Sequence, residues 1–323
     1  MNEVERRTRP FDVITLADAC ADLIVTGDVR PRFHQVEQFV DSFSVQPGGS
    51  GAIFASQMAR LGASTAIVGW LGADLFGEYV RTELQKTGVD VTRVKRHPAL
   101  HTCIGLALSE ENDRAILTYA GTLDAPSAND LDPGLLSSCR HSHIAAFFLM
   151  RQLKPAWKPW LQLCRRSGVT TSLDTNWDPE ESWGGVLELL PWIDVFLPNE
   201  AEALAISGKP DVHSAAHALA GNGCLVVVKR GEKGALAMLG DDCWEFRADQ
   251  SPIRPQRVID TTGAGDNFDA GFLRAWLRGD SIDECLLLGH RCAVASLAFA
   301  GGFAGQICEL DTQPMRTESR IEE

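Results

Sequence analysis

The chain has 323 residues, 45% of them hydrophobic, which is long enough for one large domain with a well-buried core. Its formal net charge of −13 argues against nucleic-acid binding, which needs clustered Lys and Arg, and its apolar runs are too short to cross a bilayer. Nine scattered cysteines without a C-x-x-C pair, and an N-terminus without the apolar stretch of a signal peptide, favour reduced thiols in a cytoplasmic protein.

Short apolar runs alternate with amphipathic stretches along the chain. The runs predict buried strands at 11–16 with 22–25, 66–68, 144–148, 170–173, 195–197 and 225–228. The amphipathic stretches predict helices at 52–61, 76–87, 157–166, 201–207 and 215–220. This alternation predicts a single α/β domain over residues 11–310, built on a doubly wound, mostly parallel sheet, with flexible tails at 1–10 and 311–323.

Two segments break this rhythm. Residues 32–46 and 102–120 alternate like exposed antiparallel strands, and the second has a turn at 111–113. We expect them to form a small projecting β-sheet lid, with its strands within 28–47 and 100–121, that covers a ligand.

A glycine-rich turn near residue 263 is the sharpest local signal. Gly263, Ala264 and Gly265 stand immediately before an amphipathic helix that ends near Gly279. The first backbone N–H groups of a helix lack intrahelical partners and favour an anion, which glycines allow to come close. Asp266 follows in the first helical turn, where its carboxylate could accept a proton from a hydroxyl that attacks phosphorus. A plain tight turn, with Asp266 stabilising the helix dipole, explains the same residues.

Four segments together identify a family resemblance. They are PGGSGAIFASQMARLGASTAIVGWLGADLFGEYVRTELQKTGVD at 47–90, LPNEAEA at 197–203, VVVKRGEKGA at 226–235 and DTTGAGDNFDAGF at 260–272. In this order and separation they resemble the ribokinase-like (PfkB) carbohydrate kinases over residues 11–305. The resemblance implies an enzyme that uses ATP and Mg²⁺ to phosphorylate a hydroxyl of a small sugar or sugar-like polyol.

The resemblance also assigns roles to particular residues. Asp266 matches the family's catalytic base, and the turn before it matches an anion hole. The implied substrate contacts are Asp22, Gly48 and Gly49; the nucleotide contacts are Lys229 and Gly231; and Asn199 with Glu202 organises Mg²⁺ through bound water. A monovalent cation near Asp260 and a homodimer through the lid are further family features that the sequence leaves open.

Several of these residues also have plain structural explanations. Asp22 could cap a turn, Asn199 could be a helix N-cap, and Glu202 could be an exposed helix residue. Lys229 could touch phosphate or simply cap the exposed end of its strand. The pair His141 and His143 is spaced like a metal site on one strand face, but we interpret it as structural for want of further ligands.

The chain departs from the family pattern at three places. Ile53 stands where the family usually has a substrate-contacting Asn, Asp178 follows the D-x-N segment where an Arg is frequent, and Lys229 replaces a frequent Thr. Ile53 and the lack of an evident aromatic slot lower the prospect of a nucleoside kinase of the same fold. Other hypotheses are a non-catalytic sugar- or nucleotide-binding protein and an NAD-dependent oxidoreductase, although the latter's G-x-G-x-x-G loop is absent after the first strand.

Overall fold

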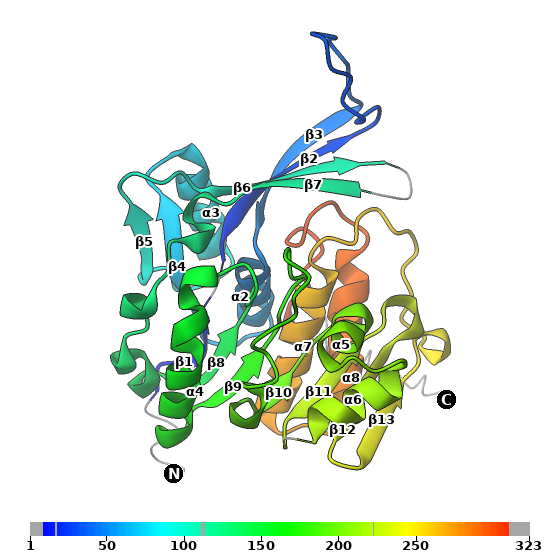
Figure 1. The fold of residues 1–323 in the computed structure, drawn as a ribbon. Helices are drawn as coiled ribbons and strands as arrows, with labels where there is room; N and C mark the ends of the chain where they lie inside the picture. The colour runs from blue at the N-terminus through cyan, green and yellow to red at the C-terminus, as the bar shows by residue number, and fades with distance from the viewer. Residues whose placement is uncertain (1–8, 17, 111–113, 222, 310–323) are drawn as a thin grey trace, which may run out of the picture.

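A nine-stranded sheet forms the centre of the protein (Figure 1), in a computed structural model that describes residues 9–16, 18–110, 114–221 and 223–309. The strand order is β13-β12-β11-β10-β9-β8-β1-β4-β5. All neighbours from β11 to β5 are parallel, whereas β12 and β13 continue one edge in antiparallel pairing. The strands are β1 (Phe11–Leu16), β4 (Thr65–Gly72), β5 (Val94–His97), β8 (Cys139–Ile144), β9 (Thr170–Leu173), β10 (Val195–Phe196), β11 (Leu225–Lys229), β12 (Ala235–Leu239) and β13 (Asp242–Phe246).

Helices cover both faces of this sheet, which confirms the predicted doubly wound fold. Successive residues of β1 contribute to different core clusters: Ile14 to the one that contains Trp160 of α4, and Val13 to the one that contains Phe272 of α7. A strand that is buried on both faces must be apolar throughout, as its sequence is. The helices are α2 (Ser50–Arg60), α3 (Leu75–Lys86), α4 (Trp157–Arg166), α5 (Glu200–Ser207), α6 (Val212–Ala220), α7 (Ala264–Arg278) and α8 (Ile282–Ser296).

A separate four-stranded sheet projects above the main sheet as the predicted lid (Figure 1). Its strands, in the order β3-β2-β6-β7, are β2 (Cys20–Thr26), β3 (Ser42–Gly48), β6 (Cys103–Ser109) and β7 (Arg114–Tyr119). β2 pairs with β3 in antiparallel and with β6 in parallel register, and β6 pairs with β7 in antiparallel register. The prediction of a small projecting sheet is therefore confirmed, but β2 lies outside the predicted bounds of 28–47.

Three predicted strand positions were wrong in detail. The run 22–25 belongs to lid strand β2 rather than to the first core strand. Residues 32–41 form no strand, so only the end of that predicted segment, from Ser42 onward, pairs. The strand expected at 144–148 lies at Cys139–Ile144, where polar side chains made the strand hard to recognise.

The predicted tails at 1–10 and 311–323 lie almost wholly outside the described residues, as does the predicted turn at 111–113. Every helix in the described part of the chain is too short or too polar to span a bilayer.

Candidate active site

The glycine-rich turn begins α7 as the sequence predicts. Gly263 is the N-cap residue and has the left-handed φ of 73°, a conformation that favours glycine. A Cβ added there would lie 2.8 Å from the Cα of Gly302 and 2.9 Å from Cδ1 of Ile53, so no larger residue fits. Asn267 fastens this turn by donating from Nδ2 to the carbonyls of Gly263 (2.8 Å) and Gly302 (3.0 Å). The backbone of the predicted anion hole is thus fixed before any ligand arrives.

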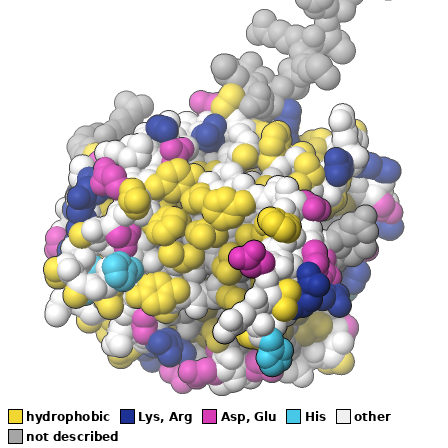
Figure 2. Space-filling view, turned by 90° about the horizontal axis from the view of Figure 1, so that it is seen from above, with side chains coloured by type: hydrophobic (Ala, Val, Ile, Leu, Met, Phe, Trp, Pro, Cys, Tyr) yellow, Lys and Arg dark blue, Asp and Glu magenta, His cyan; other side chains and the backbone are white. Residues whose placement is uncertain are grey.

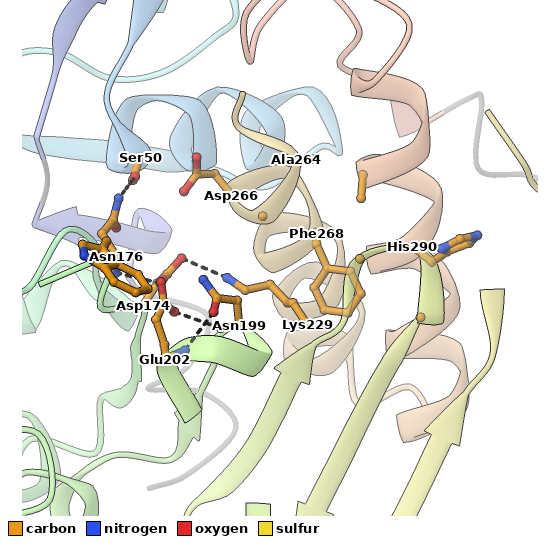
Figure 3. Close-up of a pocket in the computed structure, with 15 residues that line it drawn as sticks. Ser50, Asp174, Asn176, Asn199, Glu202, Lys229, Ala264, Asp266, Phe268 and His290 are labelled. Carbon is orange, nitrogen blue, oxygen red and sulfur yellow. Dashed lines mark hydrogen bonds and ion pairs between the residues drawn. The ribbon is translucent and has the colours of Figure 1, made fainter. Parts of the chain in front are cut away.

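Asp266 lies in the first turn of α7 and lines the cavity in front of the glycine turn (Figure 3). Its pKa is raised to about 7, first by burial and then by the charge of Asp174, while Lys229 acts in the opposite direction. A carboxyl group with this pKa is half ionised near neutral pH. It can therefore accept a proton and still lose it again, as a general base must.

Lys229 ends β11 with its ammonium enclosed between two carboxylates. Its Nζ lies 3.0 Å from Oδ2 of Asp174 and 2.8 Å from Oδ2 of Asp269 on α7. Burial opposes its charge, but these two carboxylates hold its pKa above the usual value. Only 12% of the side chain is exposed, so the alternative of an exposed strand cap is wrong.

The ammonium of Lys229 lies directly beneath the anion-hole turn. A Cβ built on Gly265 would be 3.5 Å from Nζ. Lys229 also lines the cavity. Its contact with the nucleotide stays a prediction. Asp269 is almost completely buried, and the charge of Lys229 acts to lower its pKa against the effect of burial.

Asn199 and Glu202 form a capping box at the start of α5. Oδ1 of Asn199 accepts from the backbone N–H of Glu202, and Oε2 of Glu202 accepts from the backbone N–H of Asn199, both at 2.9 Å. The N-cap explanation of Asn199 is therefore confirmed. The alternative that Glu202 is an exposed helix residue is wrong, because it is 3% exposed and burial raises its pKa to about 7.

Both residues also line the cavity, as a role in organising a cation requires. Within the described ranges, no group of three or more His, Cys, Asp and Glu side chains is placed to hold a metal ion directly. Carboxylate and amide oxygens suit Mg²⁺, which keeps several of its waters. These donors therefore fit a water-mediated site better than direct coordination.

Asp22 lies in the middle of lid strand β2, so the turn-cap explanation is wrong. Its carboxylate lies flat between two glycines of the neighbouring strands. A Cβ on Gly48 would come within 2.1 Å of Oδ2, and one on Gly105 within 2.6 Å of Oδ1. Gln46 and Ile24 lie on the same face of the lid as Asp22, and both approach Gly301 of the main domain. This face of the lid is therefore turned toward the main domain.

Gly49 forms the N-cap of α2 with a φ of 92°, and a Cβ there would lie 2.8 Å from the carbonyl oxygen of Asp18. The Asp18 carboxylate accepts from the backbone N–H groups of Ser50 (3.1 Å) and Gly51 (2.9 Å). This buried aspartate was missed from the sequence. It fixes the Gly-Gly turn against the first core strand.

The D-x-N segment supplies two further cavity residues. Asn176 has the left-handed φ of 57°, and its Nδ2 donates to Oγ of Ser50 at 2.7 Å (Figure 3). Trp177 lines the cavity, and 49% of its surface is exposed. Its ring packs edge to face against Trp183, with the ring centroids 4.8 Å apart. Asp178, in place of the frequent Arg, turns inward and accepts from the backbone N–H groups of three residues between 180 and 183.

The cavity in front of Asp266 has a volume of about 390 Å³, and a second cavity of about 600 Å³ adjoins it. They share Gly231, Ala264, His290 and Ala293. The first has several polar and charged side chains in its lining, among them Asp174, Asn199 and Lys229, and the second includes apolar residues such as Ile253, Val258 and Leu297. Gly231 has a φ of 55° and stands where the two cavities meet.

A C-terminal segment joins the two helices of the site. Gln306 is buried and donates from Nε2 to the carbonyl of Ile53 on α2 (2.9 Å) and to Oδ1 of Asn267 on α7 (3.1 Å). Its Oε1 accepts from Oγ of Ser56 at 2.5 Å. Ile53 itself is 2% exposed, so at this position packing against the anion-hole turn replaces the polar contact usual in the family.

The His141 and His143 pair is part of the sheet interior, as expected. Nε2 of His141 and Nδ1 of His143 each lie 2.7 Å from Oγ of Ser172, and His143 stacks on Phe54 with ring centroids 3.9 Å apart. Burial lowers the pKa of both rings to about 3, so they stay neutral.

Comparison with known proteins agrees with this geometry. The model of the pfkB family carbohydrate kinases matches residues 12–304. The chain is 32% identical to a cytidine kinase of Thermococcus kodakarensis, covering 83% of this chain and 93% of that protein, and 27% identical to the ribokinase of Bacillus subtilis, covering 97% and 98%. An E. coli structure described as a ribokinase II in complex with ATP and Mg²⁺ shares the fold, with a TM-score of 0.81, 23% identity and coverage of 93% and 97%. The chain thus belongs to the pfkB family of carbohydrate kinases.

Proposed function

We propose that the protein transfers the γ-phosphate of ATP to a hydroxyl group of a small sugar or sugar-like polyol, with Asp266 as the catalytic base. One observation carries the proposal: a cavity-facing carboxyl group with a pKa of about 7 lies beside the glycine turn that begins α7. A phosphoryl group needs a backbone anion site, and the attacking hydroxyl needs a base, at the same place.

The mechanism follows from the positions of the side chains. Asp22 and Asn176 hold hydroxyl groups of the acceptor, and ionised Asp266 takes the proton of the hydroxyl that attacks the phosphorus. Backbone N–H groups of Gly263, Ala264 and Gly265 stabilise the negative charge that develops on the transferred phosphoryl group.

The two adjoining cavities fit a nucleotide. The polar one suits the phosphates, and the more apolar one, of about 600 Å³, suits the base and ribose. Gly231, at their junction, and Lys229 are the proposed contacts. The ATP and Mg²⁺ bound by the E. coli structure of the same fold support this assignment.

Asn199 and Glu202 are the residues that would hold Mg²⁺, through water, and the ion would neutralise charge on the nucleotide phosphates. We also propose a monovalent cation near Asp260, whose carboxylate joins the loop at Gly301 (2.9 Å) to the start of the glycine turn by accepting from Thr262 (2.9 Å). Activity in potassium against activity in a tetraalkylammonium salt tests this point.

ATP consumption in the presence of Mg²⁺ and a panel of pentoses, hexoses, inositols and nucleosides tests the function. The wild type is compared with Asp266→Asn, and with Asp283→Asn on α8 as a matched control outside the cavity. Acceptor-dependent turnover that Asp266→Asn loses and the control keeps is the expected result. Ligand binding without ATP consumption would instead favour a non-catalytic binding protein, and tight NAD binding would favour an oxidoreductase.

A nucleoside kinase is the second candidate, and Trp177 favours it. Its half-exposed ring on the cavity wall offers the aromatic surface for a base that the sequence did not reveal. The cytidine kinase from Thermococcus kodakarensis points in the same direction. Turnover of nucleosides alone, with a loss in Trp177→Ala that Trp177→Phe restores, would establish this candidate over the sugar kinase.

We further propose that two copies of the chain pair through the outer face of the lid. The register aligns three rows of apolar residues on the face opposite Asp22: Ala21, Pro47, Ile104 and Tyr119; Leu23, Val45, Leu106 and Leu117; and Val25, Phe43, Leu108 and Ala115. Phe43, Leu117 and Tyr119 are at least half exposed, and Figure 2 shows hydrophobic side chains gathered on the face of the molecule that carries the lid.

A symmetric pair would bury such a face against itself. Light scattering on the eluting protein would report a dimer for the wild type and a monomer for Leu117→Glu. Thr118→Glu places the same charge on the opposite face of β7 and should stay dimeric. Equal masses for all three proteins would refute the lid dimer.

Seven buried cysteine thiols support the proposal that the enzyme works in the reducing cytoplasm.

A further inference from the structure

We infer that Ser50 is a positioning residue of the proposed kinase: its hydroxyl group donates a hydrogen bond to the carboxylate of Asp266 and holds that carboxylate toward the acceptor. The inference rests on the proposed function and adds a residue to the same site. It is carried by the hydrogen bonds around Ser50 and by the way in which the start of α2 is capped.

The first residue of α2 keeps its side chain free of the helix. A serine at the start of a helix often bonds the exposed backbone N–H groups of its own first turn. Here the carboxylate of Asp18 takes that place, because it accepts from the backbone N–H groups of Ser50 at 3.1 Å and Gly51 at 2.9 Å. The hydroxyl group of Ser50 is therefore left to the cavity, which this residue lines together with Asn176 and Asp266.

The hydrogen bonds of the Ser50 hydroxyl group have a fixed direction. A hydroxyl group has one proton to donate and two lone pairs that accept. Oγ of Ser50 accepts from Nδ2 of Asn176 at 2.7 Å, and an amide nitrogen can only donate. The single proton of the Ser50 hydroxyl group thus remains for another acceptor.

The carboxylate of Asp266 is in the right place to be that acceptor. Figure 3 shows the side chain of Ser50 beside this carboxylate, with the dashed line joining Ser50 to Asn176. The starts of α2 and α7 pack closely here, since a Cβ on Gly263 would lie 2.9 Å from Cδ1 of Ile53. Burial raises the pKa of Asp266, and a hydrogen bond from the side chain of Ser50 acts against this effect.

The hydrogen bond would have two effects on the base. It stabilises the ionised form of Asp266, which the charges of Asp174 and Asp18 oppose. Lys229 also favours the ionised form, but from the side of β11 rather than from α2. The bond further ties one carboxylate oxygen of Asp266 to α2, so that the other oxygen is kept for the hydroxyl group of the acceptor.

Two substitutions at position 50 and one matched control test the inference. Ser50→Ala removes the hydroxyl group, and Ser50→Thr keeps it. Ser214→Ala is the control, because the hydroxyl group of Ser214 also bonds an aspartate at the start of a helix, Asp211 at 2.7 Å, but outside the cavity. The values of kcat and kcat/KM would be measured from about pH 5.5 to about pH 9.5, with Tm as the check on folding.

Loss of the hydrogen bond in Ser50→Ala should favour the protonated form of Asp266. The midpoint of the pH profile should therefore rise by about 1 pH unit, which is a tenfold change in proton affinity. On the plateau at high pH, kcat should fall by about tenfold while the KM of ATP stays unchanged. Ser50→Thr should return both values toward those of the wild type, and Ser214→Ala should change neither. A serine with a purely structural role would lower Tm without moving the midpoint, and that result would overturn the inference.

A second measurement does not depend on turnover. In protein labelled with ¹³C at the aspartate carboxyl groups, the resonance that disappears in Asp266→Asn reports the protonation of this residue directly. If no acceptor is phosphorylated, the proposed function fails, but a higher midpoint of this resonance in Ser50→Ala would still support the hydrogen bond. Equal midpoints in the wild type and Ser50→Ala would refute the inference and leave the proposed function standing.

Discussion

Gly105 gives the sharpest test of the acceptor site, because it touches Asp22 without contacting the nucleotide cavities. It lies directly opposite Asp22 in the register of β6 with β2. A Cβ at this position would lie 2.6 Å from Oδ1 of Asp22, about 0.8 Å short of the 3.4 Å at which ordinary contacts begin. Its φ lies outside the left-handed region, so Gly105→Ala should disturb the carboxylate rather than the backbone.

The size of the effect follows from the hydrogen bonds at stake. A displaced Asp22 carboxylate should lose at least one hydrogen bond to an acceptor hydroxyl, and hydrogen bonds to charged groups contribute about 1.5–3 kcal/mol. This corresponds to a loss of about 10- to 150-fold in kcat/KM for the acceptor. Most of the loss should appear in the KM of the acceptor, while the KM of ATP stays unchanged.

Steady-state kinetics with varied acceptor at saturating ATP, and then with varied ATP, measure both quantities. Gly184→Ala is a matched control, because a Cβ there meets nothing within 4 Å. The double variant Gly105→Ala with Asp22→Ala should have the same kcat/KM for the acceptor as Asp22→Ala alone, since both changes act through one carboxylate. An unchanged acceptor KM in Gly105→Ala would refute the role of Asp22, and additive losses would refute the shared cause.

The other predictions concern the base, its surroundings and the stability of the site. Asp266→Asn should lower kcat by about 10²–10⁴-fold in single-turnover assays while ATP still raises Tm, and retention of kcat would exclude this residue as the base. Because Asp266 must be ionised, kcat/KM should rise with pH to a plateau, with a midpoint near its pKa of about 7; a flat profile between pH 5.5 and 8.5 would contradict this. Lys229→Met removes the cation that lowers this pKa, so any residual activity should show a midpoint at higher pH, and a midpoint at lower pH would speak against the electrostatic argument. Lys229→Met also leaves the buried carboxylates of Asp174 and Asp269 without their cation, so it should lower the free energy of unfolding in urea by about 3–5 kcal/mol. Lys233→Met, at an exposed ion pair, should lower it by less than about 1 kcal/mol. Equal losses of stability in the two variants would refute the argument from burial.

Local patterns in the sequence predicted much of the fold. The glycine turn before α7 and the N-cap at Asn199 are encoded within a few residues, so they could be predicted from the sequence directly. Strands that are buried on both faces can be recognised by their apolar runs. Strand β8 was misplaced because it carries polar residues whose partners lie on distant segments, such as Ser172 of β9 and Trp160 of α4. Asp22 was assigned its role by resemblance, but its strand was assigned to the wrong sheet because a short apolar run looks alike in a core strand and in an amphipathic lid strand.

Contacts between distant segments were beyond the sequence. The enclosure of Lys229 depends on side chains 40 and 55 residues away, which meet only because β9 and β11 end, and α7 begins, at the same edge of the sheet. Asn176 shows the same limit: its D-x-N motif was visible, but the bond to Ser50 spans 126 positions and follows from the placement of α2.

The Gln306 bridge has a consequence for how the enzyme comes into being. The hydrogen bond from this residue to the carbonyl of Ile53 joins positions 253 apart, near the two ends of the described chain. During synthesis, α2 emerges long before the segment around Gln306, so it cannot be joined to α7 through this residue until that segment has been made. A nascent or prematurely terminated chain that lacks this segment would hold every residue assigned here to chemistry and still have an unfastened site. Contacts of such long sequence separation are expected to form slowly.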